Sequence, residues 1–170
     1  IICVIYTAFV DALRQNFLLK TSLAERISME KLKNINLAEY LDFRIVRAII
    51  EALKLCQKKQ RGLNVLAVIY SFWNDARGND IFVKLGLNRG LFKEKLMHEI
   101  KKPVTVDIDE LNFMSVLKKA TAHAIANFHK NVDIRDFLVA AAEENEDFKE
   151  ILSSAEMTIE DVDRVAVWEN

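Results

Sequence analysis

The sequence predicts an all-α protein built from two tandem four-helix repeats, packed with pseudo-two-fold symmetry and preceded by an N-terminal helical extension. Only four glycines and one proline occur among the 170 residues, far fewer than in an average chain, and helix-forming residues dominate. The hydrophobic fraction of 51% is enough for a core without disulfides at this length. An apolar pattern that starts at Leu41 begins again at Leu111, which indicates two copies of one unit.

Residues 1–40 are predicted to form the helical extension, with short helices starting at Ser22 and Asn36, each of which has a Glu three residues later, as in a capping box. Ile1–Val10 is apolar and uncharged, but the charged residues that follow end it far short of the roughly 20 residues of a membrane span. Two interpretations of residues 1–19 stay open: an amphipathic helix packed on the domain, or the end of an anchor that continues upstream and tethers the protein to a membrane.

The first repeat is placed at residues 41–102. Asp42 is expected to cap a long helix that ends at a basic cluster, Lys58, Lys59 and Arg61. Val65–Trp73 is continuously apolar, and periodicity alone does not separate a buried strand from a buried helix there. Asn79 and Asn88 look like the caps of two further helices, to Leu85 and Lys101. The predicted buried stripe of the long helix comprises Phe43, Val46, Ile49, Ile50, Leu53 and Cys56.

The second repeat is placed at residues 109–167, after an extended crossover at Val104–Ile108. Leu111-Asn-Phe113 repeats Leu41-Asp-Phe43, and a long helix to about Lys130 follows. Three alanines in the stretch Phe137–Glu143 favour a helix, and the repeat therefore predicts that Val65–Trp73 is helical too. Asn145 and Thr158 are expected to cap the last two helices, so that each unit has a long, a buried, a short and a final helix.

Charge is divided unevenly between the repeats. Residues 41–102 contain 13 Lys and Arg against 6 Asp and Glu, and residues 103–170 contain 6 against 15, which gives net charges of +7 and −9. This polarity could orient the halves on each other, steer a charged partner, or reflect two solvated faces. The two cysteines, Cys3 and Cys56, match no metal or redox spacing, so reduced thiols and a cytoplasmic location are expected.

The order of the repeats resembles the double-repeat N-terminal domain of Clp-type AAA+ protein unfoldases, the Clp R domain, from Leu41 to about Val165. The family's middle segment usually reads Glu-His-Ile/Leu-Leu-Leu-Ala/Gly-Leu, and the corresponding stretches here are Leu63-Asn-Val-Leu-Ala-Val-Ile69 and Arg135-Asp-Phe-Leu-Val-Ala-Ala141. Leu85-Gly86-Leu87 matches the family's turn, whereas Ser154-Ala155-Glu156 in the second repeat lacks the glycine.

The resemblance implies a non-catalytic domain that receives protein substrates or adaptor proteins and precedes an AAA+ ATPase module, which is expected C-terminal to Asn170. In some members the Glu of the Glu-His pair binds phosphorylated arginine. Leu63 and Arg135 stand at those positions, and neither offers a carboxylate to a guanidinium, so this activity is not expected here. The alternative is a stand-alone double-repeat interaction or regulatory protein.

Candidate partner-binding residues are two aromatic and two acidic side chains: Phe72, Trp73, Glu143 and Glu144. The aromatic pair has Ala142 and Glu143 as rough counterparts in the second repeat, so the repeat does not account for the aromatic bulk. The pair belongs either to the core or to a surface that anchors a bound peptide. The acidic pair starts the run to Asp147, which is either a solvated loop or a site for basic substrates.

No catalytic residues, metal site or cofactor are predicted. There is no Walker A loop, and His98, His123 and His129 lack the spacing of helical metal sites. Nucleic-acid binding through the basic cluster is a distant alternative and is not expected, because the domain is not basic overall and no aromatic residues interleave with these charges.

Overall fold

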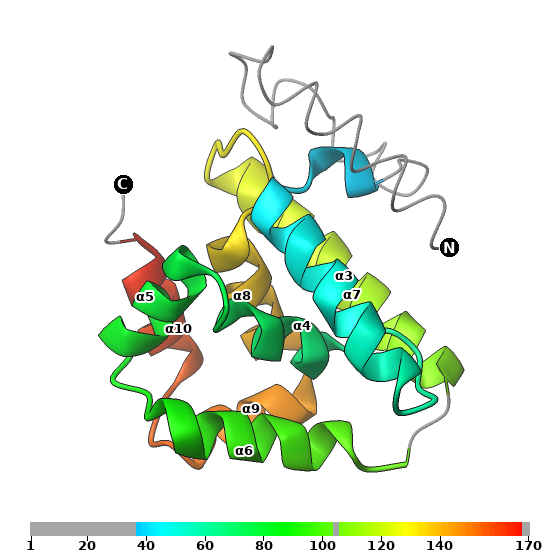
Figure 1. Ribbon diagram of the computed structural model, residues 1–170. Coiled ribbons are helices and arrows are strands. Elements are labelled where there is room, and N and C mark those ends of the chain that lie inside the picture. The colour runs from blue at the N-terminus through cyan, green and yellow to red at the C-terminus, as the bar shows by residue number, and fades with distance from the viewer. Residues whose placement is uncertain (1–36, 104–105, 168–170) are drawn as a thin grey trace.

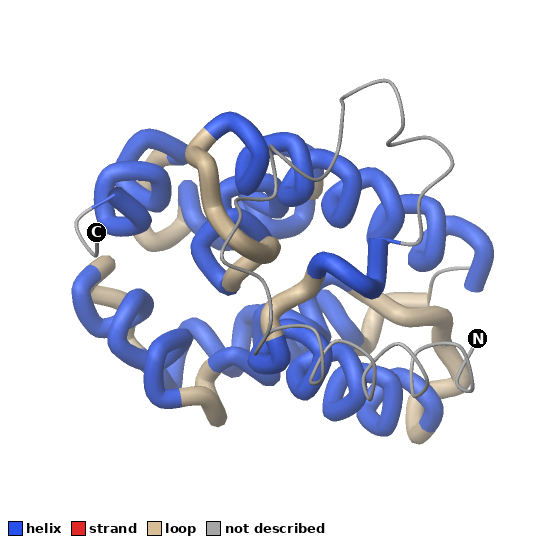
Figure 2. Tube along the Cα trace, turned by 90° about the horizontal axis from the view of Figure 1, so that it is seen from above, coloured by secondary structure: helices blue, strands red, loops and turns tan. Residues whose placement is uncertain are grey.

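The computed structural model describes residues 37–103 and 106–167, and all the regular secondary structure of these residues is helical (Figures 1 and 2). The prediction of an all-α protein is confirmed. The helix predicted to start at Ser22 and the proposed membrane anchor lie outside the described residues, whereas the short helix predicted after Asn36 is found as a 3₁₀ helix at Leu37–Tyr40. The elements are the 3₁₀ helix η2 (Leu37–Tyr40) and the α-helices α3 (Phe43–Gln57), α4 (Val65–Phe72), α5 (Ala76–Lys84), α6 (Arg89–Ile100), α7 (Val106–Ala126), α8 (Ile134–Glu144), α9 (Glu146–Ser153) and α10 (Ile159–Val167).

Two turns recur at matching places in α3–α6 and α7–α10. After each long helix the chain turns through a residue of positive φ, Gln60 (54°) after α3 and Phe128 (56°) after α7. After α5 and α9 it turns through Gly86 (70°) and Glu156 (58°). These left-handed residues end helices because the following amides bond back to the last turn.

Most predicted helix starts are confirmed by their caps. The side chains of Asp42, Asn88 and Asn145 accept hydrogen bonds from amides of α3, α6 and α9. Thr158 and Asp161 bond reciprocally at the start of α10. Val65–Phe72 is helical, as the repeat predicted.

Three predicted helix boundaries are wrong. Asp75, and not Asn79, caps α5, because its carboxylate accepts hydrogen bonds from the Arg77 and Gly78 amides. Residues 106–108 are not extended: α7 already begins at Val106, with acidic residues in its first turn that favour a helix N-terminus. The long helix of the second repeat ends at Ala126 and not near Lys130, because Phe128 adopts a positive φ.

The core is a single cluster to which both halves contribute. Phe72 of α4 and Phe137 of α8 meet edge to face, with ring centroids 5.6 Å apart, and both are fully buried. Cys56 is buried as predicted, and burial raises the pKa of its thiol, so this cysteine stays protonated and unreactive near neutral pH. Among the described residues, no helix is both long and apolar enough to cross a membrane.

Opposite charges connect the two halves at several points. The Arg61 guanidinium pairs with Asp109 across 2.8 Å, and both side chains are buried. Arg77 lies 3.7 Å from Asp133, and Lys95 donates to the carbonyl oxygen of Ser154 at the end of α9. Part of the charge polarity of the sequence therefore orients one half on the other.

The turn at Glu156 leads to a stability prediction. A side chain costs about 1–2 kcal/mol in the left-handed region, and glycine escapes most of this cost. Glu156→Gly is expected to raise the free energy of unfolding by about 1 kcal/mol in urea titrations. Gly86→Ala is the matched control: no atom lies within 4 Å of the added Cβ, so a loss of similar size would come from φ alone. An unchanged or lowered stability of Glu156→Gly would contradict the prediction.

Candidate functional site

Phe72 and Trp73, predicted as candidates for peptide binding, are both core residues. Phe72 is 0% exposed and Trp73 is 3% exposed. The Trp73 ring stacks on Phe82 at 4.4 Å and also contacts Phe92. Of the two interpretations, the structure therefore favours core packing. A partner could not touch these rings unless α4, α5 and α6 separated.

Glu143 and Glu144 lie elsewhere, at the end of α8. The Glu143 carboxylate accepts a 2.9 Å hydrogen bond from His123 Nε2 and lies 3.1 Å from Lys119 Nζ, and both of these residues are on α7. Burial disfavours ionisation of Glu143, but the hydrogen bonds from His123 and Lys119 outweigh it and lower its pKa. Glu144 is exposed and accepts a hydrogen bond from Ser115. This pair joins α8 to α7 and is not brought together with Phe72 and Trp73.

The basic cluster predicted after α3 is divided by the fold. Lys58 and Lys59 are exposed, whereas the Arg61 side chain is buried and donates to Asp109 and to the carbonyl oxygens of Ile100 and Lys102. Only two of its three charges face solvent. This weakens the nucleic-acid alternative further, because phosphate binding needs accessible cations.

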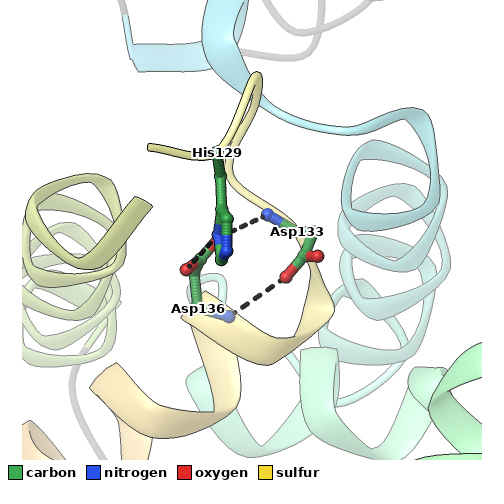
Figure 3. A group of neighbouring side chains, drawn as sticks. All are labelled: His129, Asp133 and Asp136. Carbon is green, nitrogen blue, oxygen red and sulfur yellow. Dashed lines mark hydrogen bonds and ion pairs between the residues drawn. The ribbon is translucent and has the colours of Figure 1, made fainter. Parts of the chain in front are cut away.

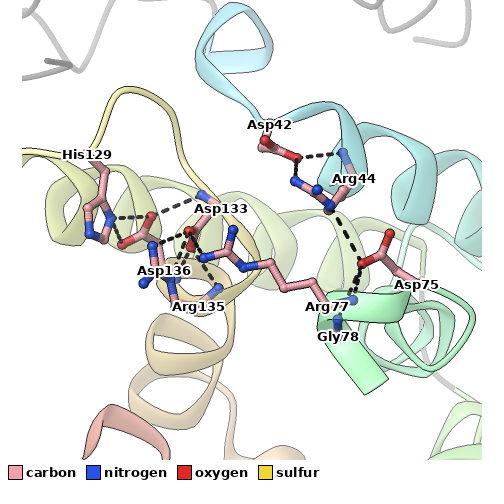
Figure 4. A network of polar contacts seen from close by, with 9 residues as sticks. All are labelled: Asp42, Arg44, Asp75, Arg77, Gly78, His129, Asp133, Arg135 and Asp136. Carbon is pink, nitrogen blue, oxygen red and sulfur yellow. Dashed lines mark hydrogen bonds and ion pairs between the residues drawn. The ribbon is translucent and has the colours of Figure 1, made fainter. Parts of the chain in front are cut away.

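A polar network joins three helix N-termini to the end of α7 (Figure 4). Asp42, Asp75 and Asp133 are the caps of α3, α5 and α8. The Arg44 guanidinium lies 3.5 Å (Nη1) from the Asp42 carboxylate and 3.9 Å (Nε) from the Asp75 carboxylate. Helix N-termini carry partial positive charge, so three aspartates are well placed there. The network also includes Arg77, Arg135, Asp136 and His129, which give a nearly balanced set of charges.

At one end of this network, His129, Asp133 and Asp136 lie close enough to suggest a cation site (Figure 3). The carboxylate oxygens of both aspartates already accept hydrogen bonds. The Asp133 carboxylate accepts from the Arg135 and Asp136 amides and from the Arg135 guanidinium, and Asp136 accepts from His129 and the Asp133 amide. A cation would have to displace these donors and sit beside Arg135, so the geometry favours a structural ion-pair network.

The network shifts the titration of its members. Burial opposes ionisation of Asp133, but the hydrogen bond and charge of Arg135 outweigh it and lower the Asp133 pKa. The hydrogen bond from His129 to Asp136 raises the pKa of the imidazole. Burial raises the pKa of Asp136 in spite of the hydrogen bond from His129. When His129 is protonated, its charge offsets that of the buried carboxylates between the end of α7 and the start of α8.

Two exposed aromatic side chains, Phe43 and Phe128, lie at the end of the molecule that holds this network; we call them the aromatic end. Phe43 is 40% exposed and Phe128 is 73% exposed. The backbone holds the two segments together, because the Asp42 amide donates to Val132 and the Val132 amide donates to Tyr40. The prediction that Phe43 is buried is wrong. Counted back along α3 and α7 from the equivalent turn residues Gln60 and Phe128, Phe43 corresponds to Leu111, which is also exposed, and the buried Phe113 corresponds to the buried Ile45.

Packing does not explain Phe128. It is a bulky residue at φ 56°, where Gln60 stands in the first repeat. The left-handed conformation costs free energy, and the exposed ring gains little burial. Residues that are unfavourable for folding on both counts are candidates for function. The sequence did carry a signal: an aromatic at a turn whose repeat counterpart is polar.

Comparison with solved structures places this fold. The Hsp104 N-terminal domain from Candida albicans superposes with a TM-score of 0.61 at 17% sequence identity, covering 72% of this chain and 85% of that one. The chain has the fold of a Clp N-terminal domain. No family model matches the sequence, and no curated protein matches it.

Within the Clp N-domain fold, the two positions expected to replace the family's glutamate have structural roles. Leu63 is buried and precedes the cap of α4. Arg135 lies inside the first turn of α8 and pairs with Asp133 across 2.7 Å. Leu63 thus lies before the start of α4, whereas Arg135 lies within α8.

The His129 contact makes stability depend on pH. A histidine whose pKa is raised by folding stabilises fully below its unfolded pKa of about 6.5, and this contribution is lost as pH rises through the folded value. The free energy of unfolding is therefore expected to fall as the pH rises above about 6.5. His129→Asn, whose amide can still donate to Asp136, should flatten this slope in denaturant titrations. An equal slope in both proteins would show that His129 is not its source.

Proposed function

We propose that this chain is a docking domain of a Clp-type AAA+ unfoldase and binds protein substrates or adaptor proteins without covalent chemistry. Two observations support the proposal. The fold is that of the Hsp104 N-terminal domain, and the aromatic end offers two exposed rings beside the charged network of Figure 4. Aromatic side chains next to charged groups often dominate the free energy of protein interfaces.

The aromatic end supplies the residues that we expect to contact a partner. Phe43 starts α3, and the Arg44 guanidinium lies 4.7 Å from its ring centroid. Phe128 sits in a turn fixed by two amide hydrogen bonds to the end of α7. Both rings are thus presented by an ordered backbone, which lowers the entropy lost when a partner binds.

Binding of a permanently unfolded protein, such as reduced and carboxymethylated lactalbumin, tests the site by fluorescence anisotropy. The double variant Phe43→Ala/Phe128→Gln is expected to bind at least about tenfold more weakly, because loss of anchor side chains typically costs more than 1 kcal/mol. Gln is chosen because the first repeat has Gln60 at this turn.

Leu91→Gln is the matched control, since Leu91 is 61% exposed on α6. Its affinity should stay within about twofold of the wild type. Equal binding by the double variant and the wild type would remove the aromatic end from the proposal. The reading frame beyond Asn170 tests the rest: a Walker A motif supports the unfoldase context, and a stop codon would leave the stand-alone interaction protein.

A further inference from the structure

An apolar row lies on the first half of α7, on the side away from the core. Ile108, Leu111 and Met114 are 50%, 70% and 41% exposed. Their spacing of three residues places them in one row along the helix. The core-facing side of the same turns carries Phe113, Val116 and Leu117, all of them buried. The helix is therefore apolar on two sides.

Neighbouring apolar side chains that share an exposed face are typical of a contact surface. Single exposed apolar residues are ordinary, and Val83 on α5 and Leu91 on α6 are of this kind. The row on α7 differs because three neighbouring side chains share one face. No element among residues 37–103 and 106–167 shields it, so any segment that covers it lies outside these residues.

The N-terminal part of the chain enters beside this helix. η2 packs on α7, and Leu37, its first residue, is buried. The Tyr40 carbonyl oxygen accepts from the Val132 amide, which fixes where the chain enters. α7 has 21 residues and is about 30 Å long. Ten extended residues span about 33 Å, and 36 residues precede Leu37, so every position of the row is within reach.

Residues 1–19 also contain the apolar side chains that could cover this row. Ile1–Val10 carries no charge, and Phe17-Leu18-Leu19 adds a second apolar group. Such residues gain free energy from burial at about 25 cal/mol per Å². Because they are tethered, their effective concentration at α7 is in the millimolar range, which gives them an advantage over a free partner or a second copy.

We propose that residues 1–19 of this chain dock on the row formed by Ile108, Leu111 and Met114 and cover the outer face of α7. This contact is independent of the aromatic end. It makes the N-terminal segment part of the folded domain and not a free linker.

Hydrogen exchange of the full chain, read on peptides from residues 1–19, tests the proposal. In the wild type these amides should exchange at least about tenfold more slowly than in a free peptide of the same sequence. Ile108→Lys/Leu111→Lys should abolish this protection. Because both side chains are largely exposed, the exchange of α4 and α8 should stay unchanged and show that the fold is intact.

Val83→Lys/Leu91→Lys is the matched control, with exposed apolar residues on other helices, and should keep the protection. Exchange of residues 1–19 as fast as in the free peptide would overturn the proposal. So would protection that survives the α7 substitutions. Protection that vanishes on about a hundredfold dilution would overturn it in favour of a second copy, since a tethered contact does not depend on concentration.

Discussion

Asp109→Ala is expected to lower the free energy of unfolding by about 3–5 kcal/mol, because it leaves the Arg61 guanidinium buried without its counter-ion. Asp109 is 2% exposed, and its carboxylate accepts from Arg61 Nε at 2.9 Å, from Arg61 Nη2 at 2.8 Å and from Asn64 Nδ2 at 2.7 Å. Arg61 also donates to Ile100 and Lys102 at the end of α6. One carboxylate thus holds the turn after α3 against α6 and the start of α7. Urea unfolding followed by circular dichroism measures the loss.

Arg61→Met/Asp109→Leu separates the charge effect from packing. Removing both partners leaves no unpaired buried charge, and such replacements are often neutral or stabilising. The double variant should therefore be at least about 1 kcal/mol more stable than Asp109→Ala, although it loses the bonds to α6. A double variant as unstable as the single one would mean that the pair matters for shape and not for charge.

Phe72→Ala is expected to cost about 3–5 kcal/mol, as is typical of a large aromatic removed from a core. The ring is fully buried, and it meets Phe137 edge to face at 5.6 Å across the boundary between the halves. The cavity would open between α4 and α8, which pack against each other. Thermal and urea unfolding both measure the effect.

Phe43→Ala is the same substitution at a surface position and should change stability by no more than about 0.5–1 kcal/mol. The contrast between the two phenylalanines tests the fold directly. If Phe72→Ala instead reduced partner binding at unchanged stability, the ring would have to be accessible, contrary to its burial. Loss of binding by Trp73→Ala would need the same stability check before any docking role could be inferred.

Local features were predictable because neighbouring residues decide them. The side chains of Asp42, Asn88 and Asn145 accept hydrogen bonds from backbone amides two or three residues later, and such bonds need no distant partner. Asp75 and Asn79 are four residues apart and both have side chains that can cap a helix, but only Asp75 caps α5. Sequence alone does not choose between two such nearby residues.

The candidate site was less predictable. The aromatic bulk of Phe72 and Trp73 was visible in the sequence, but its burial depends on Phe82, Phe92 and Phe137 arriving from other helices. Phe128 could have been flagged by comparison with Gln60. That comparison becomes meaningful only when both turns are seen to share a positive φ.

The helical class, the repeated order of helices and most of the caps follow from the sequence alone, because periodicity and capping act within a few residues. The folded chain alone settles that Phe43 is exposed, like its equivalent Leu111, whereas Phe113 is buried, like its equivalent Ile45. It also settles that Arg61 pairs with Asp109, 48 residues away. The physical reason is the same in both cases. Burial and ion pairing depend on what the folded chain brings alongside a residue, and a residue's own neighbours in sequence do not fix that.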